Sequence, residues 1–189
     1  MDNILLSVSL GIFIIAAGIF FLIPDHGHDY LSFSGDRFFA GELWRIVTFS
    51  FVHVDIIHLI GNVIALFITT LLALEIGFTR DYFLLLFFVS STFIALIEGL
   101  IIPALIIAGA SLGIYSVLGG LSYGGRRLIP IYIFIPLIGF SIFLNPIFSS
   151  TDKLVQSLFH FFGFVSGFVL YFAIVRFINI KRRSVLEVA

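Results

Sequence analysis

Apolar runs separated by short polar segments dominate the chain. The first covers residues 4–23 and ends at Pro24-Asp25. The later runs end at glycine, proline or charged residues and cover 46–74, 81–98, 111–123, 130–148 and 154–178. A membrane-crossing helix needs about 20 apolar residues, so the pattern predicts six membrane helices, one of them short. We therefore expect an all-α membrane protein in which residues 1–189 form a single domain.

Two segments between the apolar runs are not expected to form membrane helices. Residues 25–44 are too polar to cross a membrane and carry several aromatic side chains, which predicts an interfacial loop with short helices. Residues 99–110 are apolar but contain Gly99, Pro103 and Gly109, which predicts a loop. The helix that follows, 111–123, would rise only about 20 Å against a hydrocarbon core of about 30 Å. The predicted bundle therefore has a short central fourth helix whose N-terminus lies below the outer surface.

Composition supports a lipid environment. The chain is 60% hydrophobic and only 11% charged, whereas soluble domains carry about 25% charged residues. The net charge of −1 shows no excess of basic residues of the kind that nucleic-acid-binding proteins carry. The absence of cysteine excludes disulfides, thiolate metal sites and a cysteine nucleophile. The polar cluster at residues 25–29 is interpreted as a solvated loop, so no metal and no cofactor are expected.

The positions of the basic residues predict an orientation. With six spans and both termini in the cytoplasm, all but three of the ten Lys and Arg residues lie on the inner side. The exceptions are Arg37, Arg45 and Lys153. The basic tail Lys181-Arg182-Arg183 would then be cytoplasmic. Glu98, near the outer end of the third span, is expected to face water.

Four polar residues interrupt the apolar runs, and such residues inside a membrane are usually functional. They are His58, Asn62, Ser111 and His160. Helix rise places all of them about 20–26 Å from the cytoplasmic boundary, at similar depth. A loop at this depth must be buried by protein or line a watery cavity. A serine at a helix N-terminus in such a cavity, near free N–H groups, suggests a hydrolytic site.

Helical spacing indicates how these residues meet. His58 and Asn62 share one helix face, and Tyr115 lies one turn after Ser111. Gly163 and Gly167 form a small-xxx-small pair on roughly the same face as His160, which permits close helix approach. Packing of the sixth helix on the fourth would therefore bring His160 to Ser111. As alternatives, each polar residue alone could serve only interhelical hydrogen bonding, and Tyr115 could serve only packing.

Four motifs resemble those of the rhomboid family. Gly109-Ala110-Ser111-Leu112-Gly113 is similar to its G-x-S-G nucleophile motif, and the segment from His53 to Asn62 is similar to its H-x-x-x-x-H-L-x-x-N segment. His160 to Gly167 is similar to its H-x-x-G-x-x-x-G helix, and Trp44-Arg45 is similar to the W-R pair that ends its first loop. The motifs occur in the family's order over residues 44–167.

The resemblance implies an intramembrane serine endopeptidase and assigns roles to the residues. Ser111 would be the nucleophile and His160 its base, as a dyad without a carboxylate. Asn62, His58 and the Ser111 backbone N–H would hold the oxyanion. Tyr115 would stack on the His160 ring, and Gly109 would permit the turn before the serine. Trp44 and Arg45 are interpreted as structural, and His53 as structural or as a helper beside the cavity.

The resemblance also implies partners and a location. Substrates would be single-span membrane proteins cut near the outer end of their helix, in the lipid bilayer of a prokaryotic plasma membrane. Oligomeric state is left open. A second hypothesis is a catalytically inactive rhomboid-like protein that binds transmembrane helices. Its only support is Leu112, which replaces the family glycine after the serine, and the presence of both Ser111 and His160 argues against it. A small transporter would tend to have paired broken helices in two repeated halves, whereas this sequence has one broken segment. A zinc-dependent protease would need an H-E-x-x-H motif, which is absent.

Overall fold

The computed structural model describes residues 2–126 and 151–188, and within this part of the chain all regular structure is helical. Long helices are α1 (Asp2–Leu22), α5 (Ile56–Glu75), α8 (Ser111–Gly124) and α10 (Thr151–Val188). A further long helix is continuous from α6 (Arg80–Leu84) through the π-helical segment η3 (Leu85–Ser90) to α7 (Ser91–Ile101). The all-helical prediction is confirmed for these residues, and the predicted span 130–148 lies outside them.

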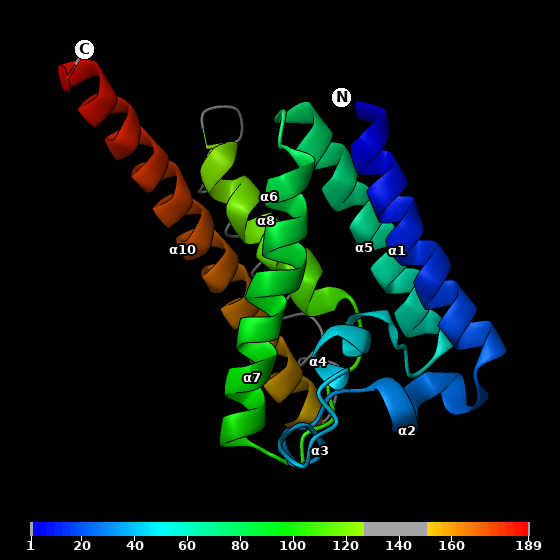
Figure 1. The fold of residues 1–189 in the computed structure, drawn as a ribbon. Helices are drawn as coiled ribbons and strands as arrows, with labels where there is room; N and C mark the ends of the chain where they lie inside the picture. The colour runs from blue at the N-terminus through cyan, green and yellow to red at the C-terminus, as the bar shows by residue number, and fades with distance from the viewer. Residues whose placement is uncertain (1, 127–150, 189) are drawn as a thin grey trace.

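The helices pack as a bundle with both described chain ends on one side. In Figure 1, α1 lies beside α5, α10 runs along the opposite edge, and α8 lies between them. Short elements gather at the other end of the bundle: η1 (Pro24–Gly27), α2 (His28–Leu31), α3 (Gly35–Phe39), α4 (Arg45–Thr48) and η2 (Phe49–Phe51). The prediction of short helices in this loop is therefore confirmed.

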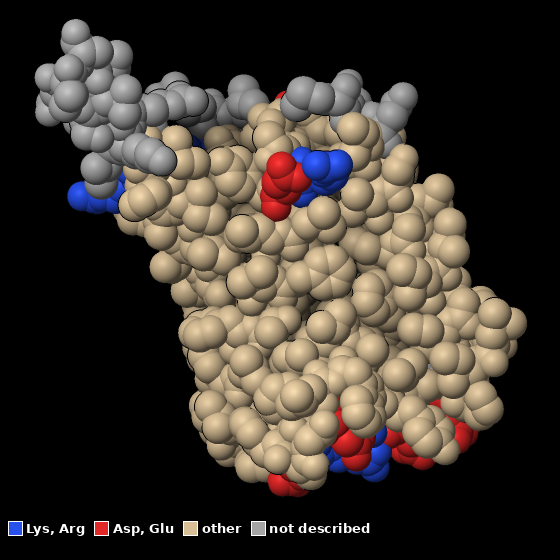
Figure 2. Space-filling view, in the orientation of Figure 1, with Lys and Arg blue, Asp and Glu red and all other residues tan. Residues whose placement is uncertain are grey.

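The surface has the character expected of a membrane protein. Figure 2 shows charged side chains at the two ends of the visible face and an uncharged belt between them. Large apolar side chains are exposed on the long helices, for example Ile57 at 80% and Phe21 at 69%. Four described helices are long and apolar enough to cross a membrane: Ile4–Leu22, Ile56–Glu75, Arg80–Ile101 and Val155–Ile178. Helix α8, with 14 residues, is not among them.

The predicted second span begins too early. Residues 46–51 belong to α4 and η2 instead, and α5 begins only at Ile56. The side chain of Asp55 accepts a hydrogen bond from the His58 backbone N–H at 2.7 Å, and it thereby caps the first turn of α5. The apolar residues Phe49 and Val52 are buried in the protein core and do not continue the membrane helix.

Close backbone contact joins α8 to α10. A Cβ added to Gly167 would lie 1.9 Å from the Ser116 carbonyl oxygen, and one added to Gly119 would lie 2.0 Å from the Phe164 carbonyl oxygen. The Ser116 hydroxyl donates to the Gly163 carbonyl at 3.1 Å, across the interface. Helices can approach this closely only where side chains are minimal. The glycines of α10 thus fix its position relative to the N-terminal half of α8.

This contact predicts a stability difference between two Gly→Ala variants. Gly167→Ala places a methyl group against the Ser116 backbone, which cannot move without displacing α8, so we expect a loss of about 2 kcal/mol or more of unfolding free energy. Gly18→Ala on α1 meets nothing within 4 Å, so we expect unchanged or slightly raised stability. Unfolding in mild detergent measures both, and equal stability of the two variants would contradict the packing.

Candidate active site

The site centres on a contact between the first residue of α8 and a histidine of α10. The Ser111 Oγ lies 2.9 Å from the His160 Nε2, within hydrogen-bonding distance. His160 is only 8% exposed. When the imidazole carries its proton on Nδ1, the serine hydroxyl donates this bond and Nε2 accepts it. The arrangement is that of a hydroxyl poised to lose its proton to a neighbouring base.

The ring of Tyr115 supports the imidazole. It lies one turn after Ser111 on α8 and stacks on His160, with ring centroids 4.6 Å apart and planes 19° from parallel. In the described part of the chain, no carboxylate hydrogen-bonds to His160. Stacking against an aromatic face therefore restricts the ring orientation, which a carboxylate does in many serine hydrolases.

The residues before Ser111 form a tight turn against α5. Gly109 has a φ of +118°, a conformation that L side chains rarely adopt. A Cβ at this position would lie 2.8 Å from the His58 Nε2 and 3.3 Å from the Asn62 Nδ2. His58 and Asn62 therefore both lie beside the turn that leads into α8. The Gly109 backbone N–H donates to the Phe49 carbonyl at 2.9 Å, which holds the turn in place.

Asn62 has an unused donor at this point. It is 8% exposed, and its Nδ2 has no hydrogen-bond partner among the described residues. A buried amide N–H without a partner is costly unless a ligand or an intermediate uses it. The unpaired Nδ2 of Asn62 and the ring of His58 thus both lie beside the turn that leads to Ser111.

A cavity of about 1050 Å³ joins these groups. The described residues that line it include Ser111, His160, Tyr115, His58 and Asn62, together with the apolar loop 105–108. Its size is sufficient for a short peptide segment. No group of three or more His, Cys, Asp or Glu residues in the described ranges is arranged to hold a metal ion.

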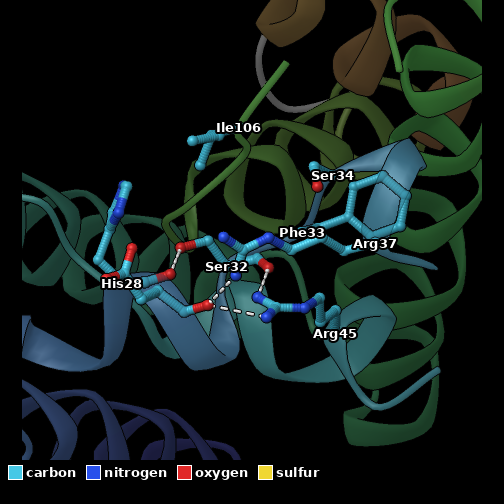
Figure 3. A pocket seen from close by; sticks show the side chains of 8 residues that line it. His28, Ser32, Phe33, Ser34, Arg37, Arg45 and Ile106 are labelled. Carbon is cyan, nitrogen blue, oxygen red and sulfur yellow. Dashed lines mark hydrogen bonds between the residues drawn. The ribbon is translucent and has the colours of Figure 1, made fainter. Parts of the chain in front are cut away.

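Arg45 holds the loop over this end of the bundle. Its side chain is 3% exposed and donates to the backbone carbonyls of Ser32 at 2.6 Å and Asp29 at 2.8 Å, and it pairs with Glu42 at 2.5 Å. Figure 3 shows the guanidinium turned toward the segment that carries Ser32. Phe33 in turn exchanges two backbone hydrogen bonds with Ile107, at 2.9 and 2.8 Å. Arg45 thus positions the loop that precedes Ser111.

The structure also shows the surroundings of Glu98 and Leu112. Glu98, expected to face water, is 1% exposed, because the end of α7 packs against residues 33–35. Leu112 is buried at 3% in a cluster with Phe33, Phe49, Ile94 and Ala95. The bulk that replaces the family glycine is therefore accommodated in the core beside the nucleophile turn.

His53 lies just outside α5 and is buried against His58. Its Nδ1 lies 3.3 Å from the Phe51 carbonyl, its ring makes an edge contact with His58, and it is 1% exposed. Burial, together with the nearby His58, lowers the pKa of His53 to about 4, despite the opposing effects of the Phe51 carbonyl and Asp55. His53 is therefore neutral at physiological pH and has a packing role next to the site.

The features above define a helical integral membrane protein with a largely apolar cavity that contains a few polar side chains. A sequence profile described as the rhomboid domain matches residues 40–177, and the chain belongs to the rhomboid family. Members of this family are generally serine proteases. No curated protein sequence matches the chain.

The lowered pKa of His53 predicts a pH-dependent stability. Between pH 6.5 and 4 the unfolded chain binds a proton at His53 that the folded chain excludes, so unfolding free energy falls as pH falls through this window. The contribution is at most about 3 kcal/mol. We expect His53→Gln, which stays neutral and can still donate to Phe51, to have a shallower pH dependence of stability than the wild type. Thermal unfolding at pH 7 and at pH 4.5 tests this, and an unchanged slope would contradict it.

Proposed function

We propose that the protein is an intramembrane serine endopeptidase that cleaves single-span membrane proteins near the outer end of their transmembrane helix. The observation that carries the proposal is the 2.9 Å contact between Ser111 and His160 inside a cavity of a rhomboid-family bundle. A Ser–His pair at the N-terminus of a helix, with unused donors beside it, is suited to acyl transfer.

The reaction follows from the positions of the side chains. The Ser111 Oγ attacks the scissile carbonyl carbon while its proton passes to the His160 Nε2. The peptide C–N bond then breaks, the amine leaves with that proton, and an ester to Ser111 remains. His160 then takes a proton from a water molecule, whose oxygen attacks the ester carbonyl. The bond to the Ser111 Oγ breaks, the carboxyl product leaves, and His160 returns the proton to Ser111. Stacking of Tyr115 holds the His160 ring in the orientation in which Nε2 faces the Ser111 Oγ during both steps.

Stabilisation of the oxyanion is assigned to Asn62, His58 and the Ser111 backbone N–H. The proximity of both α5 side chains to Gly109 supports this assignment. The unpaired Nδ2 of Asn62 supports it further, because such a donor costs no reorganisation when negative charge develops. Gly109 leaves the space that both side chains need.

The length of α8 supports a transmembrane segment as the substrate. A helix of 14 residues rises about 21 Å, so α8 does not reach across a hydrocarbon core of about 30 Å. We infer that Ser111 lies below the outer membrane surface, with both termini cytoplasmic in a prokaryotic plasma membrane. A peptide bond would reach Ser111 only from a transmembrane segment that unwinds locally, since helical backbone is shielded.

The alternative is a catalytically inactive relative that binds transmembrane helices. Replacement of the family glycine by Leu112 favours it. The burial of Leu112 in an apolar core cluster weighs against it, because the bulkier side chain is accommodated while Ser111 and His160 remain 2.9 Å apart. Chemical reactivity of Ser111 separates the two hypotheses.

The dyad predicts a specific pattern of covalent labelling. A fluorophosphonate probe should label the wild type in detergent but not Ser111→Ala, and labelling of His160→Ala should fall by several orders of magnitude in rate, on the order of 10⁴-fold or more. The control is Ser122→Ala, which removes a hydroxyl bonded within α8 to the Gly119 carbonyl and should label like the wild type. Equal labelling of Ser111→Ala would remove the proposed nucleophile.

The oxyanion assignment predicts a loss of kcat in Asn62→Ala. Removal of one donor costs about 10²–10³-fold in acyl-transfer enzymes. Thr69→Val is a suitable control, because Thr69 lines the same cavity two turns further along α5, and it should retain most of the wild-type kcat. Cleavage of a single-span substrate in liposomes measures both variants. A near-wild-type kcat for Asn62→Ala would assign the oxyanion to other donors.

A further inference from the structure

The π-helical segment η3 contacts both helices that carry the reactive pair. It lies where α6 passes into α7, and it packs against α8 and α10 (Figure 1). Toward α8, a Cβ added to Gly113 would lie 2.7 Å from the Phe87 carbonyl oxygen. Toward α10, the Ser90 hydroxyl donates to the Ser166 Oγ at 2.8 Å. Since α8 begins with Ser111, η3 packs against the first turn of this helix.

The π-helical turn places two serines in the protein core at its end. A π turn contains one residue more than an α turn, so it rotates the residues that follow relative to those before it. Ser90 and Ser91 are 1% and 0% exposed. The Ser91 hydroxyl donates to the Phe87 carbonyl in its own helix, whereas the Ser90 hydroxyl is directed to α10. Such turns are frequent at functional sites, and this one presents a donor to the helix that carries His160.

The bond from Ser90 adds a constraint that the glycine contacts of α10 do not supply. Gly167 lets α10 approach α8 closely, but a surface without side chains restricts rotation of a helix less than a directed hydrogen bond does. Helical periodicity puts Gly167 about 20° and Ser166 about 120° from His160 around the axis of α10. A hydrogen bond to Ser166 therefore holds a second face of α10 and resists rotation of the helix.

We propose that Ser90 is a positioning residue that acts through Ser166 and sets the rotation of α10 at which the His160 Nε2 meets the Ser111 Oγ. The inference rests on the proposed protease function and adds to it a residue without contact to substrate. The imidazole lies about 6 Å from the helix axis, so a rotation of about 10° moves it by about 1 Å. Movement by this amount away from Ser111 would break the 2.9 Å hydrogen bond. Misplacement of this size costs up to about 10²-fold in rate.

Kinetics of serine variants in liposomes test this role. Ser90→Ala and Ser166→Ala remove the same hydrogen bond, the first from a buried and the second from a half-buried position. We expect each to lower kcat about tenfold with KM nearly unchanged, because only the alignment of the reactive pair is lost. Fluorophosphonate labelling of Ser111 should slow in parallel. The double variant should lose no more than either single variant, because both act through one bond.

Ser9→Ala is the matched control. Ser9 bonds to Thr70 at 2.6 Å between α1 and α5, so this variant also removes one buried interhelical hydrogen bond, but not one made by α8 or α10. Its thermal unfolding midpoint in detergent should fall about as far as that of Ser90→Ala, while its kcat should stay at the wild-type value. The comparison separates alignment of the pair from general loss of stability.

The outcomes distinguish this inference from the protease function. It is overturned if Ser90→Ala retains the wild-type kcat, if Ser9→Ala loses as much kcat as Ser90→Ala, or if the losses of the single variants multiply in the double variant. If Ser90→Ala does not fold, Ser166→Ala decides by the same criteria. In all these outcomes the wild type still cuts and labels, so the protease function stands. A wild type that neither cuts nor labels contradicts the proposed function and this role with it.

Discussion

The contact between α8 and α10 is the constraint on which the rest of the structure depends. Because Gly119 and Gly167 present no side chains, backbone meets backbone, and Ser116 bridges the two helices by a hydrogen bond to Gly163. About one helical turn further toward the N-terminus of α8, the same packing leaves the Ser111 Oγ and the His160 Nε2 2.9 Å apart. The geometry of the reactive pair is thus set by rigid helices rather than by flexible loops.

A second constraint acts on the segment before Ser111. The chain enters α8 through Gly109 in a left-handed conformation and is tied to Phe49 by a backbone hydrogen bond. Further out, Phe33 pairs with Ile107, and Arg45 holds the segment that carries Phe33. Irregular backbone close to a membrane needs such internal hydrogen bonding, since lipid offers none. The loops therefore act as a fixed cap that keeps polar groups together over an apolar bundle.

Sequence patterns predicted most of the described helices and the residues that meet in the cavity. Apolar runs located α1, α5, the α6–α7 helix and α10 because each is long enough to cross a membrane. The glycine spacing of α10 indicated the partner face for α8. The start of α5 was missed because residues 49–52 are apolar yet buried within the protein. The capping residue Asp55 is the signal that would have located it.

The environment of Glu98 was not accessible from the sequence. A glutamate near the end of an apolar run is equally consistent with a water-facing position and with a buried one. Its burial depends on the contact of Gly99 with Gly35, residues far apart in the chain whose approach no local pattern encodes. For the same reason the cover over Leu112, formed by Phe33 and Phe49, became visible only in three dimensions.

The most direct measurement is to trap the covalent intermediate. A single-span substrate is mixed with the protein in liposomes, quenched rapidly in acid and mapped by mass spectrometry. The account predicts that the substrate fragment on the N-terminal side of the cut is joined by an ester to Ser111, and that hydroxylamine releases it. Substrate cleavage with no such ester, or with the ester on another residue, would contradict the assignment of Ser111 as the nucleophile activated by His160.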